Sequence, residues 1–482
     1  MLNYYTHRKS SAVLLFVLSI CSMAWTSLAA SREAAHTPPA LLNAIKAVGI
    51  PSSAVSIHVQ AVESTKPLLS MNAQAIVQPA SLMKLITTAA ALDLLGPDYR
   101  WTTRVYTNGA QQGDVLQGDL IIRGSGDPRF SQQDLWQLLR RLRALGIRQI
   151  TGDVILDRSL FAPYKDDAAQ FDQKPERAYN ALPDALLLDT KSVLVQLVPD
   201  ASRQRVRVTL EPYLTDFSLS APTLSVGECG DWRSQLGLRV EQKKIIFAGS
   251  YALSCGERTI AVHAYPLTHN EYFDSSLRQL WREMGGSVQG VIREGVLPAQ
   301  VQELTQWQSA ALTDAIRDIN KFSNNVMARQ LLLTLAAERG FQPASKEAGA
   351  AVIRQWLIAK GINGAELVID NGSGLSRADR LSAALLARIL QAAWLSPTMP
   401  EFIASLPLAG VDGTMRKRAE GLTVKSFAHI KTGSLTEVAG IAGYVTARSG
   451  KRMIVVCIVN HAESGKLREA MDNLLQWVYE NG

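Results

Sequence analysis

The sequence predicts an α/β fold in which the two ends of the chain share one sheet and a β-rich region is inserted between them. Apolar runs typical of strands occur near the start, at 54–61 and 67–71, and near the end, at 423–430, 438–446 and 451–460. Short β-like runs separated by glycine and proline dominate the middle of the chain. A chain of 482 residues also exceeds what one core usually serves, so two or three domains are expected.

Helical patterns indicate how these parts are divided. Pro79 opens and Gly96-Pro97 closes an alanine-rich apolar stretch, which carries the start and stop signals of a helix. Other helical patterns cover 38–48, 133–145, 309–336, 345–360, 381–394 and 465–479. We therefore expect one domain from 31–97 and 301–482, inserted β-rich domains over 98–300, and a nested module at about 189–265.

The first thirty residues predict export. His7, Arg8 and Lys9 precede an apolar run from Ala12 to about Leu28, and small residues follow it. This pattern is typical of a cleavable secretory signal over residues 1–30. The alternative is an uncleaved membrane anchor, which the polar residues that interrupt the run disfavour.

Cysteine usage agrees with an oxidising compartment. Cys229 and Cys255 lie close enough in sequence to close a loop, and export favours a disulfide between them over two free thiols. Cys457 sits inside an apolar run and is expected to be a buried small hydrophobe.

Charge and histidine spacing argue against several classes of function. The formal net charge is +7, and the basic residues are scattered rather than clustered with aromatics, so nucleic-acid binding has little support. A weak attraction to anionic envelope polymers or lipid headgroups would explain this balance, which leaves a peripheral membrane association open. The seven histidines show no metal-ligand spacing, so we expect neither a metal nor another cofactor.

A first candidate motif is Ser81-Leu82-Met83-Lys84, at the start of the predicted helix over 79–97. The three-residue spacing places a hydroxyl and an amine one helical turn apart on the same face. A serine needs a base to become a nucleophile, and lysine can act as that base only if burial and a neighbouring cation depress its pKa. The motif is weak by itself because such matches are common by chance.

Two further motifs follow much later in the chain. In Ser323-Asn324-Asn325, Ser323 would relay a proton to a leaving amine and the Asn325 amide would bond the substrate backbone, although a polar helix start is the simpler reading of this motif alone. Lys431-Thr432-Gly433-Ser434 lies on what is predicted to be an edge strand, and K-T-G is rarer by chance.

The residues of the third motif suit the binding of a carboxylate and of an oxyanion. Lys431 would attract a substrate carboxylate and lower the pKa of Lys84, and Thr432 would hydrogen-bond that carboxylate. The Ser434 N–H would form half of an oxyanion hole. The alternative is a turn of solvated residues at the end of a strand.

The three motifs together, in this order and in suitable contexts, resemble those of penicillin-binding proteins and serine β-lactamases. The surroundings are similar to one branch, the D-Ala-D-Ala carboxypeptidase/endopeptidase family, or class C low-molecular-mass penicillin-binding proteins. Besides Pro79–Lys84 and Lys431–Leu435, the segments Gly124–Pro128 and Asp370–Ser376 look like that family's segments. We expect the last two, and Asp412-Gly413-Thr414, to be structural turns and loops rather than chemical groups.

The resemblance implies more than the residues do. It implies a transpeptidase-like domain with an antiparallel sheet flanked by helices, two inserted domains, and a periplasmic location. It also implies that Ser81 is acylated by penicillin and by the D-Ala-D-Ala ends or cross-links of peptidoglycan, with peptidoglycan peptides and β-lactam antibiotics as partners. A homodimer and the balance between end-trimming and cross-link cutting are left open.

Two other functions are compatible with the motifs. A serine β-lactamase shares the nucleophile but needs a base that deacylates it quickly. Glu176 and Asn180 mimic the spacing of such a site in some β-lactamases, yet they precede Ser323 in the chain, so we interpret them as a coincidence. A non-catalytic peptidoglycan-binding scaffold is the second alternative, and the intact set of motif residues argues against it.

Overall fold

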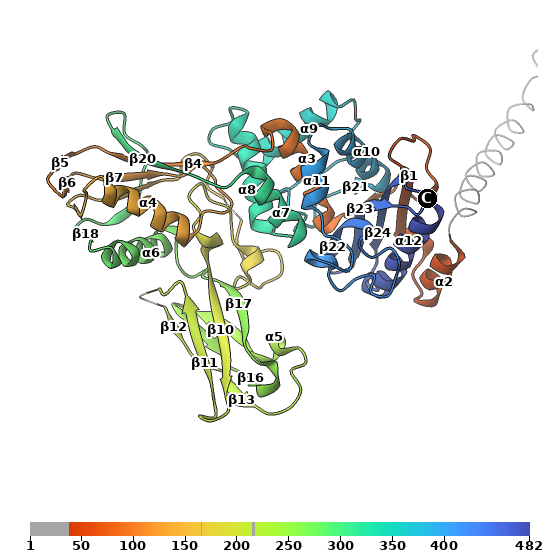
Figure 1. Cartoon of the computed structure of the whole chain (residues 1–482), viewed down its shortest axis with the longest axis horizontal. Coiled ribbons are helices and arrows are strands. Elements are labelled where there is room, and N and C mark those ends of the chain that lie inside the picture. The colour runs from red at the N-terminus through yellow and green to blue at the C-terminus, as the bar shows by residue number, and fades with distance from the viewer. Residues whose placement is uncertain (1–37, 165, 215–216) are drawn as a thin grey trace, which may run out of the picture.

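The computed structural model describes residues 38–164, 166–214 and 217–482 (Figure 1). The predicted signal peptide over residues 1–30 lies outside the described residues. Within the described part, no helix is long and apolar enough to cross a membrane.

Both ends of the described chain meet in one five-stranded antiparallel sheet, as predicted. Its strands, in spatial order, are β2 (Leu69–Met71), β1 (Val55–Ala61), β24 (Arg452–Asn460), β23 (Val438–Thr446) and β22 (Ala428–Leu435). β22 is an edge strand, and it begins later than the strand predicted over 423–430. The K-T-G motif therefore lies within an edge strand of the main sheet.

The sheet is buried on both faces, which explains why β24 is apolar from Met453 to Val459. Met453, Val455, Cys457 and Val459 pack into a core with α2 (Pro39–Ala47) and α12 (Arg468–Asn481). The alternate residues of the same strand pack into a second core on the opposite face, with the helices described next. Because successive side chains of a strand point to opposite faces, a strand between two helical layers must be apolar at every position.

The second core is helical. Its helices are α3 (Met83–Leu95), α7 (Leu312–Lys321), α8 (Asn325–Glu338), α9 (Lys346–Ala359), α10 (Ala383–Trp394) and α11 (Met399–Ser405), with a small ladder of β3 (Ile76–Val77) and β21 (Leu381–Ser382). The single helix predicted over 309–336 is wrong, because α7 ends at Lys321 and α8 begins at Asn325. Ser323, between them, has a left-handed φ of 58°, a conformation that no residue of an α-helix adopts.

The inserted region begins and ends in paired strands. β4 (Thr102–Thr107) enters it and β20 (Gln302–Gln308) leaves it, and the two pair in an antiparallel ladder. They belong to the sheet β19-β9-β7-β4-β20, beside the sheet β18-β8-β6-β5. The other elements of this body are β5 (Ala110–Gln112), β6 (Val115–Gln117), β7 (Leu120–Arg123), β8 (Gln149–Ile150), β9 (Val154–Asp157), β18 (Ser287–Val288), β19 (Ile292–Glu294), α4 (Gln132–Ala144) and α6 (His269–Glu283).

A smaller β-rich module extends from the inserted region (Figure 1). Its first sheet has the order β11-β10-β17, and its other strands form one three-stranded and one two-stranded sheet. A disulfide joins Cys229 to Cys255 within it, and Cys457 is a buried free thiol in the main sheet. Its elements are β10 (Ser192–Asp200), β11 (Arg205–Glu211), β12 (Ser218–Leu219), β13 (Thr223–Ser225), α5 (Trp232–Gln235), β14 (Leu238–Glu241), β15 (Lys244–Phe247), β16 (Ser250–Ala252) and β17 (Arg258–His263).

Candidate active site

Ser81 lies in a 3₁₀ turn, Ala80–Leu82, that leads directly into α3. The prediction that Ser81 occupies the first turn of the helix needs correction, since the α-helix itself begins at Met83. Ala80 has a left-handed φ of 50°, so the chain cannot be α-helical before Ser81. This bend leaves Ser81 partly exposed while the residues that follow it are buried.

Lys84 is completely buried and its amine makes three hydrogen bonds. Lys84 Nζ lies 3.0 Å from Ser81 Oγ, 2.6 Å from Asn325 Oδ1 and 2.5 Å from the Ser373 carbonyl oxygen. Burial lowers the pKa of Lys84 well below its ordinary value, and the nearby charges of Lys431 and Arg329 lower it further. A neutral amine in this position can accept the proton of the Ser81 hydroxyl.

The break between α7 and α8 presents the second motif to this amine. The Asn324 side chain caps α8 by accepting a hydrogen bond from the Met327 N–H at 3.1 Å. The next residue, Asn325, then starts the helix and directs its Oδ1 to Lys84. The interpretation of Ser323-Asn324-Asn325 as a polar helix start therefore holds for its middle residue, which caps α8, and the next residue, Asn325, contacts Lys84.

The K-T-G strand brings a second buried lysine beside Ser323. Lys431 Nζ donates hydrogen bonds to Ser323 Oγ at 2.9 Å and to the Thr432 carbonyl oxygen at 2.7 Å. Burial lowers the pKa of Lys431 to about 7. Gly433 lets this strand approach the Ser81 turn closely, since a Cβ there would lie 2.8 Å from the Pro79 carbonyl oxygen. Ser434 follows Gly433 on β22.

The segment Asp412-Gly413-Thr414 also contacts the motifs. Thr414 Oγ1 lies 2.9 Å from Thr432 Oγ1. Asp412 accepts a hydrogen bond from Lys321 Nζ at 2.5 Å, which ties the segment to the end of α7 just before Ser323. Sequence reasoning expected only a loop here and missed the contact of Thr414 with the K-T-G strand, because a threonine eighteen residues before its partner has no recognisable spacing.

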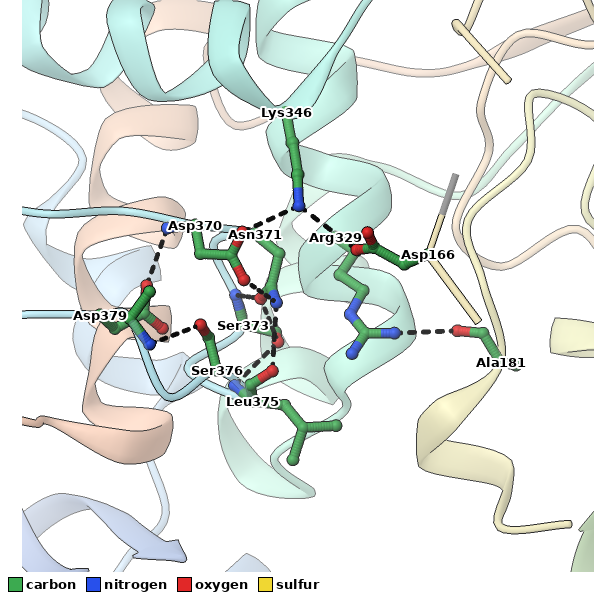
Figure 2. A network of polar contacts seen from close by, with 11 residues as sticks. Asp166, Ala181, Arg329, Lys346, Asp370, Asn371, Ser373, Leu375, Ser376 and Asp379 are labelled. Atoms are coloured by element: carbon green, nitrogen blue, oxygen red, sulfur yellow. Dashed lines mark hydrogen bonds and ion pairs between the residues drawn. The ribbon is translucent and has the colours of Figure 1, made fainter. Parts of the chain in front are cut away.

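A loop that we expected to be purely structural, Asp370–Ser376, supplies one of the three contacts of Lys84. Figure 2 shows the polar contacts within this loop. Asn371 Oδ1 accepts hydrogen bonds from the Ser373 N–H at 3.1 Å and from Ser373 Oγ at 2.7 Å. These bonds fix the residue whose carbonyl oxygen faces Lys84. The segment Asp370–Ser376 was noticed in the sequence, but its role was not. The group that contacts Lys84 is a backbone carbonyl, which every residue has, so no motif could reveal it.

One buried and three half-buried ionisable groups anchor this loop on its other side (Figure 2). Asp379, which is fully buried, accepts a hydrogen bond from the Asp370 N–H at 2.8 Å, and burial raises its pKa to about 7. Lys346, at the start of α9, forms ion pairs with Asp370 at 2.9 Å and with Asp166 of the inserted region at 3.3 Å. The loop is thus held by groups from the helical core and from the insert together.

The structure therefore unites six of the seven predicted catalytic and substrate-binding residues through side-chain or backbone hydrogen bonds. Ser81, Lys84 and Asn325 form one chain of hydrogen bonds, and Ser323, Lys431 and Thr432 form a second. The charge of Lys431 acts on Lys84 across the space between them. Among the described residues, no group of three or more His, Cys, Asp or Glu side chains could hold a metal ion.

Nearly all of the described chain, and not the motifs alone, matches one family of known proteins. The sequence matches the D-Ala-D-Ala carboxypeptidase 3 (S13) family over residues 41–480. The chain belongs to this family. Because the matched range includes both parts of the main sheet and the complete insert, membership supports a D-Ala-D-Ala carboxypeptidase activity for the protein.

Individual relatives extend this finding. A D-alanyl-D-alanine carboxypeptidase of Actinomadura sp. (strain R39) is 29% identical over 463 residues, which cover 91% of this chain and 82% of the relative. The solved structure of penicillin binding protein 4 from Haemophilus influenzae has a TM-score of 0.76 at 22% identity and covers 91% of this chain and 99% of its own. A predatory peptidoglycan endopeptidase from Bdellovibrio bacteriovorus has a TM-score of 0.53 at 16% identity, with 89% and 92% covered. The predicted penicillin-binding-protein fold with inserted β-rich parts is confirmed.

We predict that Gly374→Ala disables Ser81 while leaving the protein folded. Gly374 has a φ of 79°, and a Cβ there would collide with the Ala80 carbonyl, directly beside Ser81. We expect covalent labelling of Ser81 by a fluorescent penicillin to slow by about a hundredfold or more, as displacement by an ångström can do.

The matched control for this variant is Gly361→Ala. Gly361 has a similar φ of 69°, but a Cβ there meets no atom within 4 Å. Both variants therefore introduce left-handed backbone strain, and only Gly374→Ala adds the collision. Equal labelling rates in the two variants would contradict a role of this loop in positioning Ser81.

Proposed function

We propose that the protein is a periplasmic serine-type D-Ala-D-Ala carboxypeptidase and DD-endopeptidase that acts on peptidoglycan peptides through an acyl-serine intermediate and that also binds penicillin. The observation that carries this proposal is the buried Lys84 amine, 3.0 Å from Ser81 Oγ and with its pKa strongly lowered. The family and the relatives' substrates support the choice of peptide.

In the first half-reaction the hydroxyl of Ser81 becomes acylated. Lys84 takes the Ser81 proton, and Ser81 Oγ attacks the carbonyl carbon of the penultimate D-Ala. Backbone N–H groups of Ser81 and Ser434 stabilise the oxyanion that forms. The carbon–nitrogen bond then breaks, and the leaving amine receives a proton through Ser323, which is 2.9 Å from Lys431 Nζ.

The substrate carboxylate explains the remaining polar groups. Lys431 and Thr432 bind the carboxylate of the leaving D-amino acid, and Asn325 bonds the substrate backbone. In the second half-reaction water attacks the acyl-serine carbonyl, Lys84 takes a proton from that water, and the trimmed peptide leaves with a carboxylate while Ser81 regains its proton. No metal or other cofactor takes part in this scheme.

A β-lactamase and a non-catalytic scaffold are the rival functions. A β-lactamase would release its penicilloyl group quickly, whereas the proposed peptidase holds penicillin for long times and turns over D-Ala-D-Ala peptides rapidly. A scaffold would show no turnover that depends on Ser81. A single set of measurements with penicillin and peptides therefore separates the three functions.

We predict that Ser81→Ala abolishes both labelling by penicillin and release of D-Ala from muropeptides. The variant removes only one oxygen from a partly exposed side chain, so its thermal unfolding should match that of the wild type. The assay combines gel fluorescence after incubation with labelled penicillin and chromatography of muropeptide monomers and dimers. Labelling that persists in Ser81→Ala would overturn the proposal.

We also predict that Lys431→Gln shifts the pH dependence of acylation. Acylation needs neutral Lys84, so its rate falls as the pH drops through the pKa of Lys84. The Lys431 charge lowers that pKa, and the variant removes this charge, so the acidic limb should move to higher pH. The measurement is the acylation rate at saturating penicillin between about pH 5 and 9.

Asp379→Asn is the control variant, for which we expect the acidic limb to move in the opposite direction. A negative Asp379 raises the pKa of Lys84, so its removal should move the acidic limb to lower pH or leave it unchanged. A shift of both variants in the same direction would show that Lys84 is not the group that the profile reports.

A further inference from the structure

A large cavity opens beside the second motif, between the helical core and the β-rich module. Its volume is about 910 Å³, and its lining includes the stretch Phe322–Val326, which contains Ser323 and Asn325. Further walls come from Ala178 and Tyr179 of the inserted region and from strands β10, β11 and β17 of the module. We call this space the cavity beside Ser323. The proposed reaction uses only its edge, at Ser323 and Asn325, so most of its volume has no assigned occupant.

Two polar atoms on the wall of this cavity have no hydrogen-bond partner among the described residues. One is Asp189 Oδ2, a hydrogen-bond acceptor, and the other is Gln132 Nε2, a donor. Both atoms are buried, and both residues line the cavity. The two residues also touch, because Asp189 Oδ1 accepts a hydrogen bond from the Gln132 N–H at 3.3 Å. A buried polar atom without a partner is costly, so this pair favours a ligand that supplies both partners.

The backbone on both sides of this pair is held in place. Asp189, Thr190 and Lys191 have φ values of 47°, 52° and 50°, all left-handed and none of them at glycine. The Lys191 amine is buried and donates a hydrogen bond to the Leu267 carbonyl oxygen at 2.6 Å, which fastens the turn to the module. Gln132 is the first residue of α4, and a capping box fixes that end of the helix. The acceptor and the donor are therefore presented by ordered backbone.

The pairing of an acceptor with a donor limits the chemistry of the ligand. Burial raises the pKa of Asp189 to about 6, so at pH 7 and above its carboxylate is mainly ionised and Oδ2 accepts. An ammonium group only donates and a carboxylate only accepts, so neither satisfies both atoms. The N–H and C=O of a trans peptide unit point in opposite directions, so a peptide unit suits two residues that touch poorly. A hydroxyl group both donates and accepts, so a single hydroxyl satisfies the pair.

Three large apolar side chains are exposed on the lining of the same cavity. Phe322 is 62% exposed, Leu194 47% and Tyr179 40%. The Tyr179 hydroxyl donates a hydrogen bond to Asp172 Oδ2 at 2.7 Å, which fixes the orientation of its ring. Exposed apolar side chains that gather at one cavity mark a binding surface. A ligand that suits this cavity therefore has an apolar face as well as a hydroxyl group.

Resting on the proposed function, we propose that the cavity beside Ser323 binds a sugar ring of the peptidoglycan glycan strand that carries the substrate peptide. A hexosamine ring has hydroxyl groups on its rim and C–H groups on its faces, which is the combination that the lining requires. One hydroxyl donates to Asp189 Oδ2 and accepts from Gln132 Nε2, and a C–H face packs on the exposed aromatic side chains. Glu211 and Arg233 are exposed on the lining and can bond further hydroxyls.

The first experiment measures the binding of a sugar probe that carries no peptide. The probe is chitotetraose, a linear tetramer of N-acetylglucosamine, and isothermal titration calorimetry gives its Kd for the wild-type protein. We expect saturable binding that Asp189→Asn weakens about tenfold or more, because this variant replaces the acceptor Oδ2 by a second donor beside Gln132 Nε2. The matched control is Glu241→Gln, at an exposed carboxylate of β14 outside the lining, which should keep the wild-type Kd.

A second pair of variants tests whether the probe occupies the cavity itself. Ala261 and Thr259 are both exposed on β17, and they point to the same face because they are two residues apart on one strand. Only Ala261 lines the cavity. Ala261→Trp should therefore fill the cavity and weaken chitotetraose binding about tenfold or more, whereas Thr259→Trp should leave the Kd unchanged.

The second experiment tests whether the glycan of a substrate uses the cavity. It compares kcat/KM for D-Ala release from a disaccharide pentapeptide with that from the same pentapeptide without sugar. We expect the wild type to prefer the disaccharide substrate by about tenfold and Asp189→Asn to reduce this preference to about twofold or less. In the variant, D-Ala release from the sugar-free peptide and penicillin labelling should be unchanged, because Asp189 bonds to the inserted region and not to the motifs.

The results distinguish this inference from the proposed function. If neither substrate releases D-Ala in a Ser81-dependent manner, the proposed function fails, whereas chitotetraose binding still tests the cavity. Absence of chitotetraose binding, or an unchanged Kd in Asp189→Asn, would overturn the inference. Equal kcat/KM for the two substrates in the wild type would overturn it as well. If Asp189→Asn instead impairs hydrolysis of the sugar-free pentapeptide, the cavity recognises peptide and the inference is wrong.

Discussion

The site depends on keeping one lysine amine buried and next to one hydroxyl. Lys84 is removed from water and has three hydrogen-bond partners, Ser81, Asn325 and the Ser373 carbonyl. A buried ammonium ion loses much of its solvation, so burial moves the equilibrium toward the neutral amine. The same burial that would make Lys84 a poor surface residue therefore makes it a usable base.

This constraint explains why the partners come from distant parts of the chain. Asn325 belongs to the start of α8, Ser373 to a loop before α10, and Lys431 to the edge strand β22. Each must exclude water from Lys84 and also leave Ser81 accessible. Close approach is possible only because glycines stand at the contacts, with Gly374 and Gly433 packed against the turn that carries Ser81.

The inserted region contains none of the three motifs, but its residues contact and surround the site. Asp166 pairs with Lys346 and so supports the loop that holds Lys84 (Figure 2). The β-rich module supplies walls of a cavity next to Ser323. Insertion between two strands that pair with each other, β4 and β20, lets these parts attach to the helical core without opening it.

The sequence by itself determined the α/β class, the sharing of the main sheet by both chain ends, and the identity of the motif residues. These follow from local signals, because strand periodicity and the spacing of Ser81 and Lys84 need no partner to be read. The limits of α7 and α8 were missed, because apolar residues at helical spacing occur on both sides of Ser323 and the helix-start signal at Asn324 is a common polar residue.

Tertiary structure alone decided the contacts made by backbone atoms and by single side chains from separate elements. The Ser373 carbonyl at Lys84, Thr414 at Thr432 and Asp189 at the cavity beside Ser323 belong to this group. A carbonyl is present at every residue, and one Thr or Asp is too common to mark a site. Their significance arises only when folding brings them to a buried amine, an edge strand or a cavity, because distance and desolvation are properties of the assembled structure.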